Sequence, residues 1–433
     1  MKKILIILLI STLFTTYLFA EGLGNAKSLS LGDAYHSKAT GFHALNWNPA
    51  RLGLLEDFYT FNIFHADGRI SNNSLSLKTY NETTGDSLSH SEKLDLYDLI
   101  PTSGLTLYGN SQAFVPISSF SIGKFGFTIN NQNVGYFTLP KELFKLLLFG
   151  NDIEEEFDFS DTDAKILSYV EPKIGYGSRI YPEKYLSFYK DSYPPIYAGA
   201  SVGYMIGLAY AEVEDLTSKF TVHDNGYASI DNRISLRTAG VDTSDGELEW
   251  EPQTAGRGFR GNFSLFSPIN ENLSVGLSFN NLFANIHWSK ICKRIEMELV
   301  SDTLNIGNWD DSLAVDTTYS IDGFDQNIPV EMYLSGSYKY SDFKVFLDYV
   351  QGFGNSVLTT TTPKISLGSE YYALDWLPLR CGVGFGGREG THFSFGTGFK
   401  FGRFEFNWAV RSHHGLFYGS RGLSAATDLT LKF

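Results

Sequence analysis

The chain has 433 residues, with 48 acidic and 34 basic side chains and a formal net charge of −14. This acidic balance argues against nucleic acid as a partner, because a nucleic-acid-binding domain carries a basic face. Aromatic residues make up 15% of the chain and charged residues 19%. The mean hydropathy of −0.12 does not exclude a membrane protein, since the apolar and polar faces of a membrane-crossing strand average out.

Residues 1–20 predict a secretory signal peptide. Lys2 and Lys3 precede an almost unbroken apolar run that ends at Phe19, and Ala20 provides a small residue for cleavage. The run is short for a spanning helix, which needs about 20 apolar residues, so an uncleaved anchor is the less favoured alternative. No later stretch resembles a transmembrane helix. A membrane-embedded chain would therefore have to cross as a closed barrel, because unpaired backbone groups are too costly in lipid.

Residues 21–55 are rich in Gly, Ala and Asn and lack strand alternation. They end in Trp47, Asn48, Pro49 and Ala50, where Asn48 can bond within its own turn and Pro49 fixes a change of direction. Small residues allow a backbone to lie close to a wall. We therefore expect this segment not to form a barrel strand.

Strand-like segments separated by polar stretches follow between about residues 56 and 300. We expect strands at 56–66, 71–80, 112–119, 120–130, 164–180, 196–212, 217–223, 227–238, 256–267, 271–283 and 285–301. Two helices interrupt them. Ser91–Ile100 starts with a Ser cap and is stopped by Pro101, and Pro140–Phe149 is followed by Gly150. The second helix is apolar around most of its surface, so it is expected at the barrel mouth, in the lumen or in the outer leaflet, as a packed cap or as part of a ligand site.

The clearest alternation lies between residues 328 and 433, where aromatic residues hold one phase and charges fall on the other. This pattern predicts one face toward lipid and one toward a polar lumen. The lumen-lining candidates are Arg294, Glu331, Asp348, Arg380, Glu405 and Arg411. They indicate either a polar path or, as we prefer, ion pairs that fill a narrow barrel.

Very short turns alternate with longer connections in this region, which is typical of outer-membrane barrels. The predicted fold is an all-β, transmembrane antiparallel β-barrel of about 14 strands, within a range of about 12 to 16. We expect a signal peptide at residues 1–20, a separate segment at 21–55, the barrel at 56–433, and short helices at the mouth.

The last strand alternates Leu429, Leu431 and Phe433 with polar residues and stops on the aromatic one. It resembles the closing strand of bacterial outer-membrane barrels, where this end is read by the barrel assembly machinery. The segment from Gly32-Asp-Ala-Tyr35 to Asn48-Pro-Ala50 resembles the hatch of the fatty-acid transporter (FadL-like) superfamily, which includes the PorV/PorQ-like outer-membrane proteins. The close match covers the hatch, and the C-terminal strands match in style only.

This resemblance implies that residues 21–55 form a hatch, or plug, in the lumen of a multi-pass barrel, which lies in the outer membrane of a Gram-negative-type bacterium in contact with lipid and lipopolysaccharide. It also implies two alternative functions. In the transporters, the hatch plugs the lumen and hydrophobic small molecules such as long-chain fatty acids leave through a lateral gap in the wall. The PorV-like members instead act as partners of secreted or surface proteins. We favour uptake, although a fold alone does not decide function.

The sequence gives no support to catalytic chemistry. It contains no Gly-x-Ser-x-Gly motif and no Walker loop. His36 and His43 lie in the hatch, without the third ligand and fixed geometry that a zinc site needs. We therefore expect no enzymatic activity, no catalytic residue, no cofactor and no metal.

Overall fold

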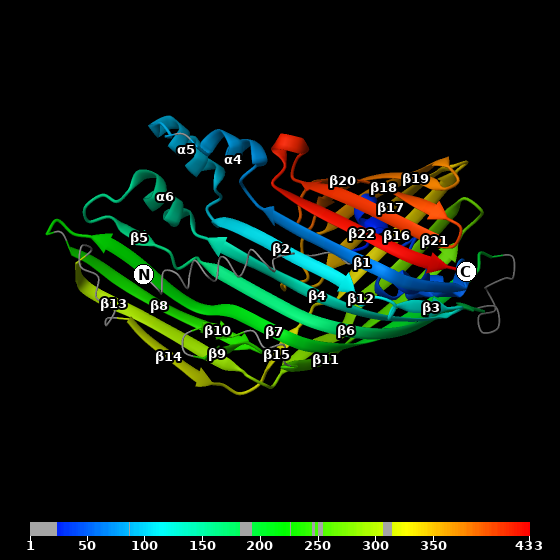
Figure 1. Ribbon diagram of the computed structural model, residues 1–433, viewed down its shortest axis with the longest axis horizontal. Helices are drawn as coiled ribbons and strands as arrows, with labels where there is room; N and C mark the ends of the chain where they lie inside the picture. Colours follow the sequence, from blue (N-terminus) through cyan, green and yellow to red (C-terminus); the bar gives the residue numbers. More distant parts are fainter. Residues whose placement is uncertain are drawn as a thin grey trace.

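A closed β-barrel is the main feature of the computed structural model, which describes residues 24–85, 87–181, 193–225, 227–244, 247–249, 254–305 and 314–433 (Figure 1). The predicted signal peptide lies outside these described residues. Fourteen antiparallel strands form the wall, as predicted, and the last pairs with the first. They are β1 (Tyr59–Asn72), β2 (Leu105–Phe114), β4 (Phe125–Leu139), β6 (Asp163–Ile180), β7 (Ile196–Val222), β11 (Gly256–Pro268), β12 (Leu273–Trp288), β16 (Glu331–Tyr340), β17 (Phe343–Gly352), β18 (Lys364–Leu374), β19 (Leu377–Gly386), β20 (His392–Phe401), β21 (Phe404–His413) and β22 (Gly422–Lys432).

The two faces of the wall differ as the alternation predicts. On β20, Phe395 is 52% exposed on the outside, while the neighbouring Ser394 is fully buried on the inside. On β21, Trp408 is exposed on the outside and Asn407 is buried inside. The outer face of this closed wall consists of exposed aromatic and aliphatic side chains. Such a face is suited to contact with lipid rather than with water.

The ends of the chain close the barrel at one rim. Tyr59 donates its backbone N–H to the Phe433 carbonyl at 3.2 Å, and Phe433 donates back to the Tyr59 carbonyl at 2.9 Å. The two-residue turns between β16 and β17, β18 and β19, and β20 and β21 lie at this rim, which we call the short-turn end. The C-terminus marks it in Figure 1.

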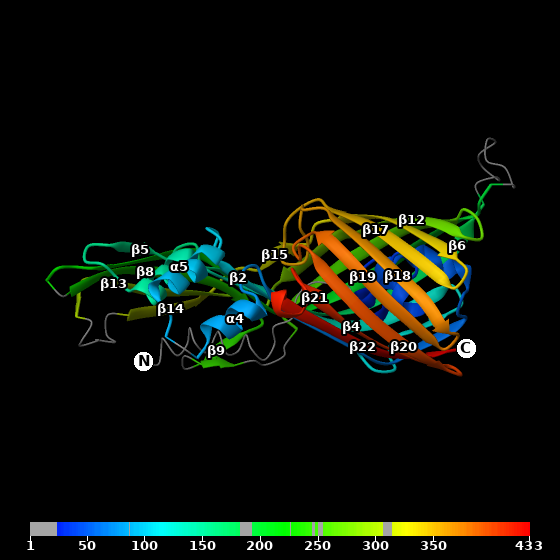
Figure 2. The same ribbon diagram turned by 90° about the horizontal axis from the view of Figure 1, so that it is seen from above.

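Beyond the opposite rim, the wall continues into a projecting sheet (Figure 2). β7 extends out of the barrel and pairs there with β5 (Glu156–Asp158) and β8 (Tyr227–Ala239), and β8 is followed by β13 (Lys293–Asn305) and β14 (Ala314–Ser320). The strands expected at 217–223, 227–238 and 285–301 therefore lie largely in this extension. A half-covered sheet shows the same alternation as a barrel wall, so periodicity does not separate the two. β15 (Phe324–Asn327) pairs with β12, and β9 (Asp242–Ser244) and β10 (Glu247–Glu249) form a separate ribbon.

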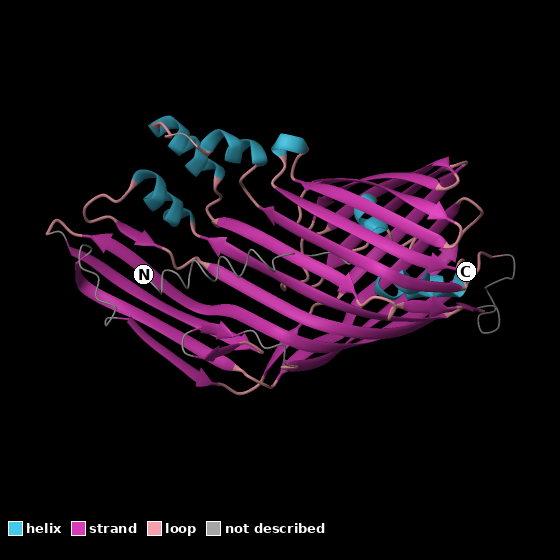
Figure 3. Cartoon of the chain, in the orientation of Figure 1, coloured by secondary structure: helices cyan, strands magenta, loops and turns pink. Residues whose placement is uncertain are grey.

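Three helices accompany the extension, drawn in cyan in Figure 3: α4 (Leu77–Thr83), α5 (His90–Leu99) and α6 (Lys141–Phe149). The two predicted helices correspond to α5 and α6, although α5 is capped by Ser89, whose side chain forms a capping box with Glu92. α6 packs on β5, where Phe157 is fully buried, and Phe149 meets Tyr97 of α5. α6 therefore packs as a cap on the extension, which is one of the two roles expected for it, and does not lie in the lumen.

The hatch lies inside the barrel and consists of α2 (Ala26–Ser30), a 3₁₀ turn (Gly41–His43), α3 (Ala44–Trp47) and a second 3₁₀ turn (Pro49–Leu54). Nearly all of its residues are buried. Among the described residues, no helix is long and apolar enough to span a membrane.

Candidate functional site

The end of the hatch turns against the inner wall at the residues that the sequence singled out. Trp47 is buried and makes edge contacts with the rings of Tyr35 at 5.3 Å and His36 at 4.9 Å. The Ala50 N–H donates to Ser264 Oγ at 2.8 Å. The side chain of Asn48 is buried and finds no hydrogen-bond partner among the described residues, so the expectation that it bonds its own turn is wrong. The turn is held by its neighbours and by the wall.

Close contact between hatch and wall depends on glycines of the wall, which the sequence interpretation missed. A Cβ added to Gly199 of β7 would lie 2.3 Å from the Ala50 nitrogen, and one added to Gly177 of β6 would lie 2.2 Å from the Pro49 carbonyl oxygen. On the opposite side, a Cβ on Gly382 of β19 would lie 2.2 Å from the Leu31 carbonyl carbon. The hatch backbone therefore touches the wall backbone at these places.

A buried ionic cluster joins the hatch to the part of the wall that lies away from the short-turn end. Asp33 of the hatch accepts hydrogen bonds from Arg411 at 2.6 and 2.9 Å and pairs with Lys364 at 2.6 Å. Glu389, in the turn after β19, pairs with Arg69 at 2.8 Å, Arg411 at 3.0 Å and Lys364 at 3.2 Å. Burial by itself raises the pKa of Glu389, but these three cations outweigh it and hold the pKa well below its usual value.

Asp33, Glu389 and His392 also form the group of described residues that brings three metal-ligand atoms together, within 4.8 Å of one another. Their two carboxylates already share three cations, and an added divalent ion would face those cations at close range. The arrangement fits an ion-pair lock better than a metal site.

Two other predicted lumen residues, Asp348 and Glu405, also contact the hatch, and a third, Arg380, is connected to it through Glu370. Asp348 accepts the backbone N–H groups of Tyr35 at 2.9 Å and His36 at 3.0 Å. Glu405 pairs with Lys27 of α2 at 2.7 Å. Arg380 donates to Glu370 at 2.7 Å, and Glu370 in turn pairs with Lys38 of the hatch. The lumen charges thus serve mainly as hatch attachments, which agrees with the ion-pair interpretation that we preferred.

Arg294 is the exception. It lies on β13 in the projecting sheet, where it pairs with Glu214 at 2.7 Å. The expectation that it lines the lumen is wrong, because the alternating segment that contains it belongs to the extension and not to the barrel wall.

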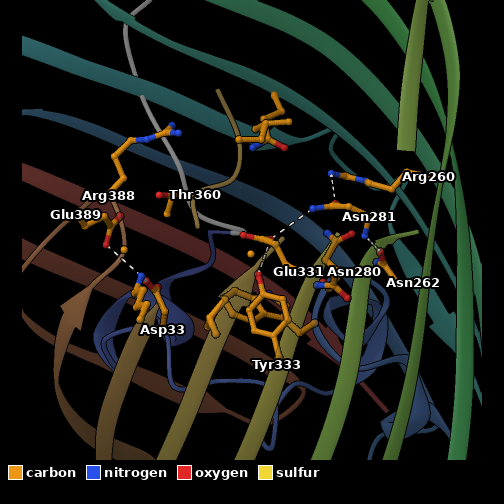
Figure 4. Close-up of a pocket in the computed structure, with 18 of the residues that line it drawn as sticks. Asp33, Arg260, Asn262, Asn280, Asn281, Glu331, Tyr333, Thr360, Arg388 and Glu389 are labelled. Atoms are coloured by element: carbon orange, nitrogen blue, oxygen red, sulfur yellow. Dashed lines mark hydrogen bonds and ion pairs between the residues drawn. The ribbon is translucent and has the colours of Figure 1, made fainter. Parts of the chain in front are cut away.

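A cavity of about 120 Å³ lies directly above the hatch (Figure 4). Its lining includes Asn46 and Trp47 of the hatch, and the wall adds the side chains of Arg260, Asn262, Asn280, Asn281, Glu331 and Tyr333. Glu331 accepts from the Tyr333 hydroxyl at 2.8 Å and from the Asn281 amide at 3.4 Å. At a share of about 30 Å³ for each water molecule, the cavity accommodates a few waters or one small molecule.

The connection between β17 and β18, residues 353–363, lies over the cavity and contributes Leu358, Thr360 and Thr362 to its lining. Its Val357 is buried in an apolar cluster with Trp288 and Ile286 of β12. Arg388 holds the same connection by donating to the carbonyls of Val357 at 2.6 Å and Thr359 at 3.0 Å, and to that of Ser356. The lumen therefore has an outer closure at 353–363 and an inner closure at the hatch.

The wall itself is interrupted between β2 and β3 (Phe120–Ile122). The prediction of a strand at 112–119 is wrong beyond Phe114, because β2 ends there and residues 115–119 leave the sheet. The backbone of Asn62 in β1 bridges the interruption. Its N–H donates to the Ser119 carbonyl at 2.8 Å, and its carbonyl accepts from the Ile117 N–H at 2.9 Å. Ile117 has a φ of 64° and is 71% exposed on the outside. Pro116 was the available signal, since proline cannot donate to a ladder and is avoided in central strands.

The hatch covers this interruption from inside. The Phe42 ring of the hatch lies edge-on to Phe114 at 5.8 Å, and His43 lies 5.8 Å from the same ring. His65 of β1 completes the cluster, 4.8 Å from Phe114. A side opening through 115–119 would require these hatch residues to move.

The closed barrel of fourteen antiparallel strands with few short helices has the FadL-like outer-membrane barrel fold, as the sequence resemblance predicted. The chain belongs to a family of unknown function, DUF5723, whose model matches residues 57–410. No curated protein matches it.

Solved structures with this fold resemble the chain over almost its whole length. The toluene transporter TodX of Pseudomonas putida is 12% identical with a TM-score of 0.52, over 95% of this chain and 98% of TodX. A FadL homologue of Pseudomonas aeruginosa is 12% identical with a TM-score of 0.50, over 96% and 100% of the two chains. The monoaromatic hydrocarbon channel CymD is 11% identical with a TM-score of 0.50, over 94% and 97%. At such identities the likeness establishes the fold.

Proposed function

We propose that this protein is an outer-membrane channel for the uptake of hydrophobic small molecules. The solute passes the outer closure at 353–363, enters the cavity above the hatch, and leaves sideways at residues 115–119 when the hatch withdraws. The observation that carries the proposal is the interruption of the wall at 115–119, because it lies where the hatch covers it from inside. A wall meant only to be sealed has no need of a gap behind a removable segment.

The named relatives support the general class of solute. TodX is described as a toluene transporter and CymD as a monoaromatic hydrocarbon channel. The cavity of about 120 Å³ is well below the roughly 300–1,000 Å³ of a pocket for a drug-sized ligand. Small aromatic molecules therefore suit the closed state. Long-chain fatty acids, the finer proposal, need the hatch to move before they are accommodated.

Docking of a secreted or surface protein is the second candidate, and the projecting sheet with its helices favours it. Apolar side chains lie exposed at this tip, among them Leu147 of α6 at 70% and Ile153 at 63%.

The apolar outer face of the barrel fits contact with membrane lipid, and lipopolysaccharide is the expected neighbour at the outer rim. The terminal Phe433 is proposed as the residue that the barrel assembly machinery reads.

A reversible tether between hatch and wall tests the uptake path. A Cβ added to Gly126 of β4 would lie 3.2 Å from Leu45 Cγ in the hatch, a spacing that suits the cysteine pair L45C and G126C. Cys292 and Cys381 are first replaced by Ser. We expect the oxidised pair to stop uptake of labelled toluene and of oleate in cells, and a reductant to restore it.

The single variant L45C controls for the loss of the leucine side chain and should not respond to reductant. Unchanged uptake by the oxidised pair would remove the side path. Replacement of residues 77–99 by a short Gly-Ser linker separates the two functions, because docking should depend on the projecting helices and uptake should not.

A further inference from the structure

A second hollow lies at the short-turn end of the barrel, on the other side of the hatch from the first cavity. We call it the vestibule. Its volume is about 390 Å³, and eight basic but four acidic residues line it. The whole chain carries a formal charge of −14, so this hollow concentrates positive charge against the overall balance.

Five of the eight basic side chains already have carboxylate partners. These ion pairs are Lys27–Glu405, Lys38–Glu370, Arg51–Glu56, Arg380–Glu370 and Lys432–Asp57. The other three are Lys339 of β16, Lys344 of β17 and Lys400 of β20, which we call the vestibule lysines. None of the three forms an ion pair within the part of the chain that the structure describes.

The vestibule lysines lie close enough to repel one another. Lys339 and Lys344 are directly opposite in the register of β16 and β17, and like charges in that position are unfavourable. Lys344 is also opposite Glu370 of β18. Both oxygens of Glu370 are already engaged, one by Lys38 and the other by Arg380.

Tyr372 connects Lys344 with Lys400. The Lys400 Nζ donates to the Tyr372 hydroxyl at 3.0 Å and lies 4.6 Å from the centre of the ring, while the Lys344 Nζ lies 5.9 Å from the same centre. The ring offers a weak cation–π attraction of about 0.5–1 kcal/mol at exposed sites. It supplies no negative charge. The fourth acidic residue that lines the vestibule, Glu271, forms no ion pair among the described residues, and the backbone carbonyl of its neighbour Asn272 accepts from the Lys339 N–H at 2.8 Å.

We propose that the vestibule lysines bind a free oxyanion, a phosphate or a carboxylate, that enters the vestibule at the short-turn end. Ammonium groups offer three donors each and form short, charge-assisted hydrogen bonds to such oxygens. An anion between them would replace mutual repulsion by attraction. The lysines alternate with lipid-facing residues of their strands and so face the lumen, which favours a free anion over a lipid headgroup. The proposal does not depend on hydrophobic uptake.

The test measures the rate at which each lysine of the folded, full-length barrel is acetylated, with inorganic phosphate as the probe. Chloride at equal ionic strength is the reference, which removes general screening. At about ten times its Kd, phosphate should leave about one-tenth of the sites free. We therefore expect acetylation of Lys339, Lys344 and Lys400 to slow about tenfold. Lys78 and Lys93 on the projecting helices should react as before.

The double variant K344Q/K400Q supplies the matched comparison, with K78Q/K93Q as its control. These exposed or half-exposed substitutions leave the paired lysines intact, and heat-modifiable migration checks that the barrel has formed. Phosphate should raise the Tm of the wild type and of the control but not that of K344Q/K400Q. Equal protection at all lysines, or none, would overturn the proposal. Protection that appears only in vesicles with anionic lipid, and not with phosphate, would also overturn it and assign the lysines to a headgroup.

Discussion

Arg411 donates two parallel hydrogen bonds to Asp33, from Nη2 to Oδ1 at 2.6 Å and from Nη1 to Oδ2 at 2.9 Å. The pair joins the hatch to β21, near the other end of the chain. Lys364 and Glu389 complete the cluster around it. The hatch is therefore fixed on this side by buried charge, whereas at Gly199 and Gly177 it is fixed by backbone contact.

Replacing Asp33 by Asn should loosen the hatch. The change leaves Glu389 as the only carboxylate that Arg411 and Lys364 share. Breaking a buried ion pair costs about 3–5 kcal/mol of folding free energy. We expect higher single-channel conductance in planar bilayers and faster proteolysis within residues 24–55. D95N, on the exposed face of α5, is the control. A D33N barrel that conducts like the wild type would show that the cluster does not hold the hatch.

The pH dependence of closure follows from Glu389. Its folded-state pKa lies well below the usual 4.5, since the neighbouring cations outweigh its burial. A carboxylate with a depressed pKa contributes stability that is present above its unfolded pKa and is lost as the pH falls through its folded pKa. Conductance should therefore stay low from pH 7 down to about 4.5 and rise only in stronger acid. Opening between pH 7 and pH 5 would contradict this assignment.

The glycine contacts predict a sharp difference between two alanine substitutions. G382A would place a Cβ 2.2 Å from the Leu31 carbonyl carbon, whereas G336A would meet its nearest atom at 3.8 Å. G382A should displace the hatch, and overpacking of this kind costs about 1–3 kcal/mol. A urea titration of both variants measures the difference. Equal stability would mean that the hatch does not touch β19 in the folded protein.

The lipid-facing register is tested at Phe395. A charge placed on the outer face near the middle of the bilayer costs about 2–4 kcal/mol, so F395R should lose that much folding free energy in lipid vesicles. F395L keeps the side chain apolar and should lose much less. Gly396, its neighbour on the inner face, is unsuitable as a control, because an added Cβ would lie 2.6 Å from Ser30 Cβ of the hatch.

The outer closure should depend on Arg388. R388Q removes a guanidinium that donates to Val357 and Thr359, and each hydrogen bond from a charged donor contributes about 1.5–3 kcal/mol. We expect faster backbone hydrogen exchange in residues 353–363 and little change in the hatch. R257Q, at an exposed position of β11, serves for comparison. An unchanged exchange rate in this connection would exclude Arg388 as its anchor.

The wall was predictable because a strand between lipid and lumen must alternate, as β21 does along its whole length. The projecting sheet was not separable from the wall, since β8 and β13 alternate in the same way. Pro116 was visible and would have divided the strand expected at 112–119. The role of this break in the wall depends on the hatch that lies behind it, and no local sequence pattern reveals that contact.

The site was only partly predictable for a related reason. Asp348, Arg380, Glu405 and Arg411 were singled out as inward charges, and they do face the lumen. Their partners were not foreseen, because Asp348 and the backbone of Tyr35 are 313 residues apart in sequence. Sequence spacing carries no information about such contacts. The wall glycines were missed for the same reason, since a glycine in a strand has many possible causes.

β7 joins the two halves of this molecule in a single uninterrupted strand of 27 residues. At about 3.3 Å for each residue it measures roughly 90 Å along its path, whereas about 9–11 residues suffice to cross a bilayer. Its far end thus stands clear of the membrane surface. The same strand carries Gly199 beneath the hatch, so the part of the protein that meets the surroundings first is covalently continuous with the part that keeps the barrel shut.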